Sequence, residues 1–234
     1  MDRRQFMAQA AAAGAVATSM FGSAEAAGGG DPVKIVGVAC STRRGKTTAQ
    51  GVRIALDAAK GVDSRIETKL FDLGGRDVPG WPGGATPSEG MAKLKKMDDY
   101  VSNEVIPELE DPTLGGLIIG SPAYFRSMSA RCKAFLERCA ALRSPDFALK
   151  DIPLGALAVG AFRNGGQELV IDQIQTIMLC HEVMVVGGKP RAHQGATLWN
   201  KSEYNDDISK DEFGVETAQD LGVRVAEAGL KLKE

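Results

Sequence analysis

Several features that mark whole classes of protein are missing from this sequence. It has no basic run and a formal net charge of -2, which argues against nucleic acid as a partner. Its weakly apolar segment, residues 8–21, is shorter and richer in alanine than a membrane span, which needs about 20 apolar residues. No internal repeat is visible, so a repeat architecture is not expected.

Cysteine is sparse and widely spaced. The chain has four, at Cys40, Cys132, Cys139 and Cys180, and no pair has the C-x-x-C spacing typical of a zinc or cluster site. Cys132 and Cys139 fall on one predicted helix, roughly 10 Å apart, which is too far for a disulfide. We predict that all four are buried small apolar residues and that the protein has no metal site.

The first 26 residues have the pattern of an export signal. Arg3 and Arg4, with Phe6 two positions on, precede the alanine-rich segment and a run of small residues that suits cleavage before Ala27. We expect a twin-arginine signal over 1–26, a flexible lead-in over 27–32 and one domain over 33–234. The protein would then be periplasmic or otherwise exported, without stable membrane insertion after processing. An ordinary amphipathic N-terminal helix is the alternative.

The rest of the chain alternates between strand and helix patterns. Strands are predicted over 33–39, 66–72, 114–120, 153–160 and 183–187. Helices are predicted over 47–61, 96–109, 130–139, 167–180 and through 218–232, with Ser129 as an N-cap. Five β-α repeats predict an α/β fold, a doubly wound parallel sheet with helices on both faces. Two long surface loops are expected, over 74–90 and 188–210.

Three loops would meet at the carboxyl ends of these strands, where open α/β sheets bind their ligands. Residues 40–48, after the first strand, are rich in hydroxyl and basic side chains and open a helix, which suits a phosphate. The loop after the third strand brings Pro122, Tyr124 and Phe125 together as a flat apolar surface. Residues 161–167, after the fourth strand, offer backbone amides beside a helix start. Together the loops predict a site for flavin mononucleotide (FMN).

The same loops resemble the signatures of the NADPH-dependent FMN reductase family of flavodoxin-like proteins. Ser41-x-Arg43-x-Gly45-x-Thr47 is similar to the first signature, with Cys40 in place of a glycine and Lys46 in place of an asparagine. The run GSPAYFRSMS at 120–129 is similar to the second signature, and RNGGQE at 163–168 to the third. The resemblance covers nearly all of the mature chain and implies a five-stranded sheet of order 2-1-3-4-5.

The resemblance also implies roles for individual residues. The phosphate would be held by Ser41, Arg43, Lys46, Thr47 and Thr48. The flavin ring would be walled by Pro122, Ala123, Tyr124, Phe125 and Met128. The pocket would be completed by Arg163, Asn164, Gly165 and Gly166. Iron–sulfur flavoproteins, one branch of the family, carry a compact cysteine cluster in the loop after the second strand, whereas residues 74–90 contain no cysteine, so no cluster is expected.

We therefore expect an exported FMN-dependent oxidoreductase that uses NADH or NADPH to reduce a flavin, a quinone or a similar small acceptor. No side chain is predicted to be catalytic, because hydride transfer from a nicotinamide to a flavin is the cofactors' own reaction. A homodimer or homotetramer is expected, in which Trp199 could pack across the subunit boundary.

Other functions remain as alternatives. A flavodoxin-type electron carrier is disfavoured because such carriers tend to be strongly acidic for docking. A flavin-binding protein without turnover is a second alternative. Gly45-Lys46-Thr47 also copies the tail of a P-loop, but position 40 is cysteine rather than glycine, and no later apolar strand ends in an aspartate suited to magnesium.

Single residues have simpler interpretations too. Tyr124 and Phe125 could be core residues at a strand end, and Arg43 could belong to a solvated turn. His181 is expected to be a positive charge at a helix C-terminus. His193 is expected to be an exposed loop residue that could contact flavin or substrate.

Overall fold

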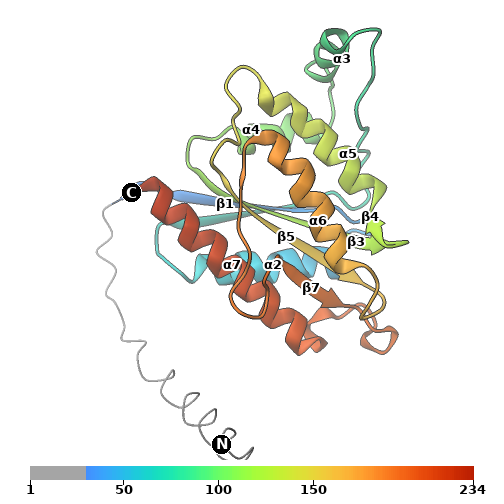
Figure 1. Ribbon diagram of the computed structural model, residues 1–234, viewed down its shortest axis with the longest axis vertical. Coiled ribbons are helices and arrows are strands. Elements are labelled where there is room, and N and C mark those ends of the chain that lie inside the picture. Colours follow the sequence, from blue (N-terminus) through green and yellow to red (C-terminus); the bar gives the residue numbers. More distant parts are fainter. Residues whose placement is uncertain (1–29) are drawn as a thin grey trace, which may run out of the picture.

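The parallel sheet expected from the β-α repeats is present in the computed structural model, which describes residues 30–234 (Figure 1). Its strands lie in the order β2 (Ile66–Asp72), β1 (Val33–Ala39), β3 (Leu114–Tyr124), β5 (Pro153–Gly160) and β6 (Met184–Val185). β4 (Ser127–Met128) pairs antiparallel with β3, and β7 (Ala196–Trp199) pairs with β5. The predicted order holds once the short β4 is left out of the count. The predicted signal and the first half of the lead-in, residues 27–29, lie outside the described residues.

Helices cover both faces of the sheet (Figure 1). α2 (Thr47–Lys60) and α7 (Glu212–Lys233) pack on one face, and α4 (Ile106–Leu109), α5 (Ala130–Arg138) and α6 (Gln167–Met178) on the other. Successive side chains of a strand point to opposite faces, so Leu117 and Ile119 join the α5–α6 core while Ile118 joins the α2–α7 core. The α/β fold with helices on both faces is therefore confirmed.

The predicted helix over 96–109 and the predicted loop over 74–90 are both partly wrong. An additional helix, α3 (Pro87–Leu94), projects from the domain on the α5 side (Figure 1). The Thr86 hydroxyl caps it by accepting from the Glu89 amide, and the Glu89 carboxylate accepts from the amide of Ala85, one residue before the cap. Thr86-x-x-Glu89 is the sequence pattern of a capping box, which the prediction overlooked. The later helix starts at Tyr100 rather than residue 96, as a π-helix (Val101–Val105) that runs into α4.

The fifth strand is split rather than continuous over 183–187. β6 pairs with the start of β5 and β7 with its end, and residues 186–195 bulge out between them. Two ion pairs fasten this bulge to α7, Lys189 with Glu227 at 2.6 Å and Arg191 with Asp220 at 3.0 Å. His193 lies exposed in this bulge, at the sheet margin.

Two predictions about buried and charged groups need correction. Cys40, Cys132 and Cys139 are buried as expected, but Cys180 is exposed, because a 3-10 turn (Leu179–His181) follows α6. That turn buries His181. Burial and, as the smaller cause, the nearby Arg143 charge lower the pKa of His181 to about 4. His181 is therefore neutral near pH 7 rather than a helix-terminal cation. Within residues 30–234, no helix has the length and apolar character needed to cross a membrane.

Candidate functional site

The loop between β1 and α2 forms the polar end of the candidate site. The side chains of Ser41, Thr47 and Thr48 are buried here, and Gly45 adopts a left-handed conformation with φ 68°. α2 has no side-chain cap and no acidic residue in its first turn. The first amides of α2 therefore have neither a side-chain cap nor an acidic residue of the helix's own first turn, an arrangement that favours an anion.

A buried hydroxyl network fixes this loop against the end of β3. The Ser129 hydroxyl donates to the carbonyl oxygen of Cys40 at 2.6 Å and accepts from the amide of Cys132 at 3.0 Å. The Ser129 amide in turn donates to the Ser121 hydroxyl at 3.0 Å. Ser129 is thus the N-cap of α5, as predicted, and it also ties the first loop to the β3–α5 connection.

The end of β2 supports the loop from the other side. The Asp72 carboxylate accepts from the amides of Gly45 at 2.6 Å and Gly74 at 2.9 Å. A Cβ atom on Gly74 would lie 2.3 Å from the Cα of Arg44, so only glycine allows the two loops to cross this closely. The loop is therefore held rigidly in place before any ligand contact.

One hollow of about 100 Å³ joins parts of all three predicted loops. It brings together seven of the predicted site residues, Ser41, Arg43, Thr47, Thr48, Pro122, Ala123 and Tyr124. It also includes four residues that were not predicted, Val159, Gly160, Ala161 and Asn200. The convergence expected at the carboxyl ends of β1, β3 and β5 is therefore present.

The predicted ring wall lies on a hairpin rather than a simple loop. β3 extends to Tyr124, and the turn at Phe125 and Arg126 has positive φ angles of 52° and 64°. The Tyr124 hydroxyl lies 3.3 Å from the Thr42 hydroxyl, which links the hairpin to the first loop. Tyr124 is 39% exposed and Phe125 fully exposed, so neither is a core residue.

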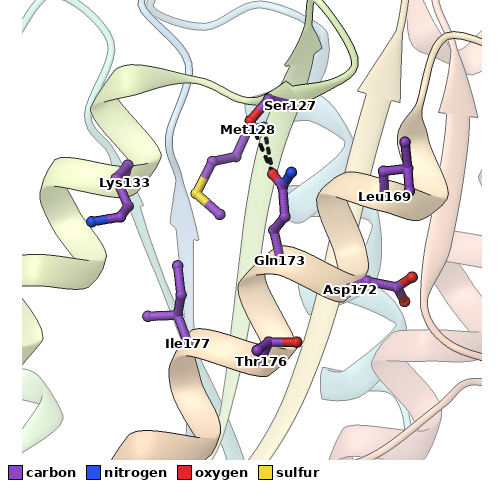
Figure 2. A pocket seen from close by; sticks show the side chains of 8 residues that line it. All are labelled: Ser127, Met128, Lys133, Leu169, Asp172, Gln173, Thr176 and Ile177. Atoms are coloured by element: carbon purple, nitrogen blue, oxygen red, sulfur yellow. Dashed lines mark hydrogen bonds between the residues drawn. The ribbon is translucent and has the colours of Figure 1, made fainter.

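Met128 lies in an adjoining groove between α5 and α6, with a volume of about 490 Å³ (Figure 2). The Gln173 side chain accepts hydrogen bonds from the Ser127 hydroxyl at 3.1 Å and the Met128 amide at 3.0 Å, drawn as dashed lines in Figure 2. These bonds fasten the hairpin to α6. The groove is lined mainly by apolar surface, including Met128, Leu169 and Ile177.

Apart from Ala161, the third predicted loop lies beside the hollow rather than inside it. Asn164 and Gly166 line a neighbouring hollow of about 280 Å³, together with Arg126. The Gly165 amide closes the turn by donating to the Phe162 carbonyl at 3.0 Å. The Arg163 guanidinium lies 4.8 Å from the ring centroid of Trp199. Ten of the fourteen predicted residues thus line one of these three hollows, and the other four, Lys46, Phe125, Arg163 and Gly165, line none of the three.

Two polar residues of the loop after β7 were missed by the sequence analysis. The Asp206 carboxylate accepts hydrogen bonds from both terminal nitrogens of Arg43, at 2.8 and 3.1 Å, and lies 3.5 Å from the Lys46 ammonium group. The Asn200 side-chain amide donates to Asp206 at 3.0 Å. The bond from Arg43 is the main cause that lowers the pKa of Asp206. The loop was recognised as long, but no sequence pattern singles out these two positions.

The residues fit FMN in two respects. The uncapped start of α2, with Thr47 and Thr48, offers donors to a phosphate group. The Asn200 Oδ1 atom is buried beside the hollow and has no hydrogen-bond partner among the described residues, so it can accept a hydroxyl such as those of a ribityl chain.

Comparisons with known proteins agree with this geometry. The family model for NADPH-dependent FMN reductase matches residues 33–197. An iron–sulfur flavoprotein of Methanocaldococcus jannaschii is 36% identical over 204 residues, which cover 86% of this chain and 100% of that protein. An iron–sulfur flavoprotein of Methanosarcina thermophila is 28% identical over 197 residues, 83% of this chain and 94% of that protein.

Solved structures share the fold. An apo NADH:FMN oxidoreductase superposes with a TM-score of 0.54 at 19% identity, over 85% of this chain and 89% of its own. A WrbA-like flavodoxin from Agrobacterium tumefaciens gives 0.56 at 15% identity, over 86% of this chain and 99% of its own. By its sequence match, the chain belongs to the NADPH-dependent FMN reductase family and is a flavin-binding oxidoreductase, with FMN and NAD(P)H as its cofactors.

Proposed function

We propose that this protein is an exported reductase that transfers electrons from NADH or NADPH, through FMN, to a small acceptor such as a free flavin or a quinone. The observation that supports the proposal is the single hollow that joins the loop between β1 and α2, the start of the hairpin and Asn200. FMN, when bound, supplies the ring that accepts hydride and passes electrons on. The chain's own residues bind and orient the two cofactors.

Each loop has a distinct share in this proposal. The phosphate is bound by Ser41, Arg43, Lys46, Thr47 and Thr48, and Asn200 accepts from the ribityl chain. The flavin ring is enclosed by the hairpin and its groove, which contribute Pro122, Ala123, Tyr124, Phe125 and Met128. Arg163, Asn164, Gly165 and Gly166 border the ring on the α6 side. Burial raises the pKa of the Cys139 thiol to about 12 and that of the Cys40 thiol well above its ordinary value, so neither of these two cysteines acts as a thiolate.

The proposal includes no iron–sulfur cluster, although the curated relatives are named as iron–sulfur flavoproteins. Three of the four cysteines lie in the core below the first loop, and Cys180 is exposed after α6. Within residues 30–234, no three His, Cys, Asp or Glu side chains are grouped so that they could hold a metal ion. Iron and acid-labile sulfide in the purified protein, in proportion to the protein, would contradict this part.

Steady-state oxidation of NADH and NADPH tests the central proposal. We expect turnover with FMN-loaded protein and a quinone or free flavin as acceptor, and a visible flavin spectrum that bleaches on addition of NADPH. FMN binding without nicotinamide oxidation would indicate a carrier or a non-catalytic flavin protein instead. Failure to take up FMN at all would refute the whole proposal.

Export and assembly are separate parts of the proposal. Changing Arg3 and Arg4 to lysine should leave a folded, unprocessed protein in the cytoplasm, whereas periplasmic processing of that variant would indicate another route. Assembly as a homodimer or homotetramer is supported by apolar side chains exposed on and after α6, Leu169 at 41% and Leu179 at 57%. Light scattering should give a mass of two or four chains.

A further inference from the structure

Two of the three cations of the first loop, Arg43 and Lys46, share one carboxylate. Arg43 donates to both oxygens of Asp206, and Lys46 lies 3.5 Å from one of them. The Asp206 side chain is 24% exposed, against 50% for Arg43 and 47% for Lys46, so the carboxylate is the inner member of the cluster. Arg43, Lys46 and Asp206 together therefore carry a net charge of +1, rather than the +2 of the two cations alone.

The position of Asp206 is fixed from several sides. Its backbone and that of Asn205 are left-handed, with φ 62° and 51°, a conformation that aspartate and asparagine tolerate better than most residues. Two residues on, the Ile208 amide donates to the Gln50 side chain of α2 at 3.0 Å, and the Ile208 side chain is buried. Asn200, which lines the hollow, donates to the Asp206 carboxylate. This carboxylate is therefore part of the built site rather than a mobile surface charge.

We infer that Asp206 limits the affinity of the site for the phosphate of FMN, and so sets how strongly the protein prefers FMN to unphosphorylated flavin and how quickly it releases FMN. This inference rests on the proposed function of the first loop. A phosphate monoester carries nearly two negative charges at pH 7. A fixed carboxylate beside it repels it and withdraws part of the Arg43 and Lys46 charge. Riboflavin, which lacks the phosphate, would not experience this repulsion.

Replacing Asp206 by asparagine tests the inference with little change of shape. Binding of FMN and riboflavin to the full mature chain is measured by quenching of flavin fluorescence, at low and at high salt. In Asp206→Asn we expect FMN to bind about 5- to 50-fold more tightly, with a matching fall in its dissociation rate. Riboflavin affinity should stay within about twofold, and the salt dependence of FMN binding should steepen.

Asp207→Asn is the matched control, because Asp207 carries the same charge in the same loop, but its carboxylate accepts from Ser209 and pairs with Lys210 rather than with Arg43 or Lys46. This variant should leave the preference for FMN over riboflavin unchanged. A similar gain in both variants would overturn the inference, because it would reflect overall charge. Weaker FMN binding in Asp206→Asn would overturn it as well, and would make Asp206 a residue that positions Arg43.

The outcomes also separate this inference from the proposed function. If the parent protein binds FMN and Asp206→Asn binds it no more tightly, the inference fails and the proposed function stands. If no variant binds FMN or riboflavin, the proposed function fails too. Circular dichroism of each variant establishes that it is folded, and Asp206→Ser provides a second neutral side chain should the asparagine variant unfold.

Discussion

Ser129 connects the candidate site to the stability of the domain, and Ser129→Ala should disturb both. Its hydroxyl caps α5 and donates to the buried carbonyl of Cys40. Losing an N-cap costs about 1 kcal/mol. Leaving a buried carbonyl without its partner costs about 1–3 kcal/mol more. The free energy of unfolding should therefore fall by about 2–4 kcal/mol, a large part of the stability of an ordinary domain.

Urea unfolding of the FMN-free protein, followed by circular dichroism, measures this loss without a contribution from FMN binding. FMN affinity should fall as well, by about 3- to 10-fold, because the first loop is no longer fastened to the β3–α5 connection. Ser209→Ala is the control, since Ser209 is exposed and its change should stay within about 0.5 kcal/mol. A loss below about 1 kcal/mol in Ser129→Ala, or unchanged FMN binding, would refute the argument that this network holds the loop.

Three further predictions concern single side chains. Arg43→Ala should weaken FMN binding by about 10- to 30-fold, the lower part of the range for a charge-assisted bond because Arg43 is half-exposed. Arg44→Ala should change FMN binding by no more than about twofold in the same titration. Tyr124→Ala should weaken FMN binding and slow flavin reduction in stopped-flow measurements, and Tyr124→Phe should restore most of both if ring packing is what matters. Burial lowers the pKa of His181 to about 4 in the folded protein, against 6.5 in the unfolded chain. Between pH 6.5 and 4 the unfolded state therefore binds more protons than the folded state, and acid favours unfolding. Stability should fall by up to about 3 kcal/mol between pH 6.5 and 4, and urea unfolding of His181→Gln should show a flatter profile from pH 7 to 5, where carboxylates contribute little.

Local patterns were sufficient to predict most of the fold. β1, β2 and β5 match the predicted strands because their apolar runs are bounded by clear turn residues. α3 was missed since it lies in a segment rich in Gly and Pro, where the capping box of Thr86 and Glu89 was the one available signal. The split of the fifth strand could not be read from local sequence, because it is defined by the pairing of β6 with the start of β5 and of β7 with its end, which only the tertiary fold sets.

The candidate site shows the same division. Ser41, Arg43 and Thr47 follow a motif of consecutive residues, and the structure gathers them in one hollow. Asn200 lines that hollow and Asp206 bonds to Arg43 from a loop more than 150 residues beyond the first loop in sequence, and only the tertiary fold brings them together. Cys180 and His181 were predicted on the wrong sides of their turn because a single 3-10 turn changes which side chain faces the core.

The split fifth strand also affects how copies of the chain can meet. Exposed sheet margins invite strand addition, in which another chain pairs with unbonded amides and carbonyls. β6 has two residues and β7 has four, and the bulge between them carries Lys189 and Arg191. At the opposite margin, β2 displays Glu67 and Lys69 on its exposed side. Both margins thus discourage open-ended stacking of sheets into fibres, and contacts between folded copies are left to the helical faces.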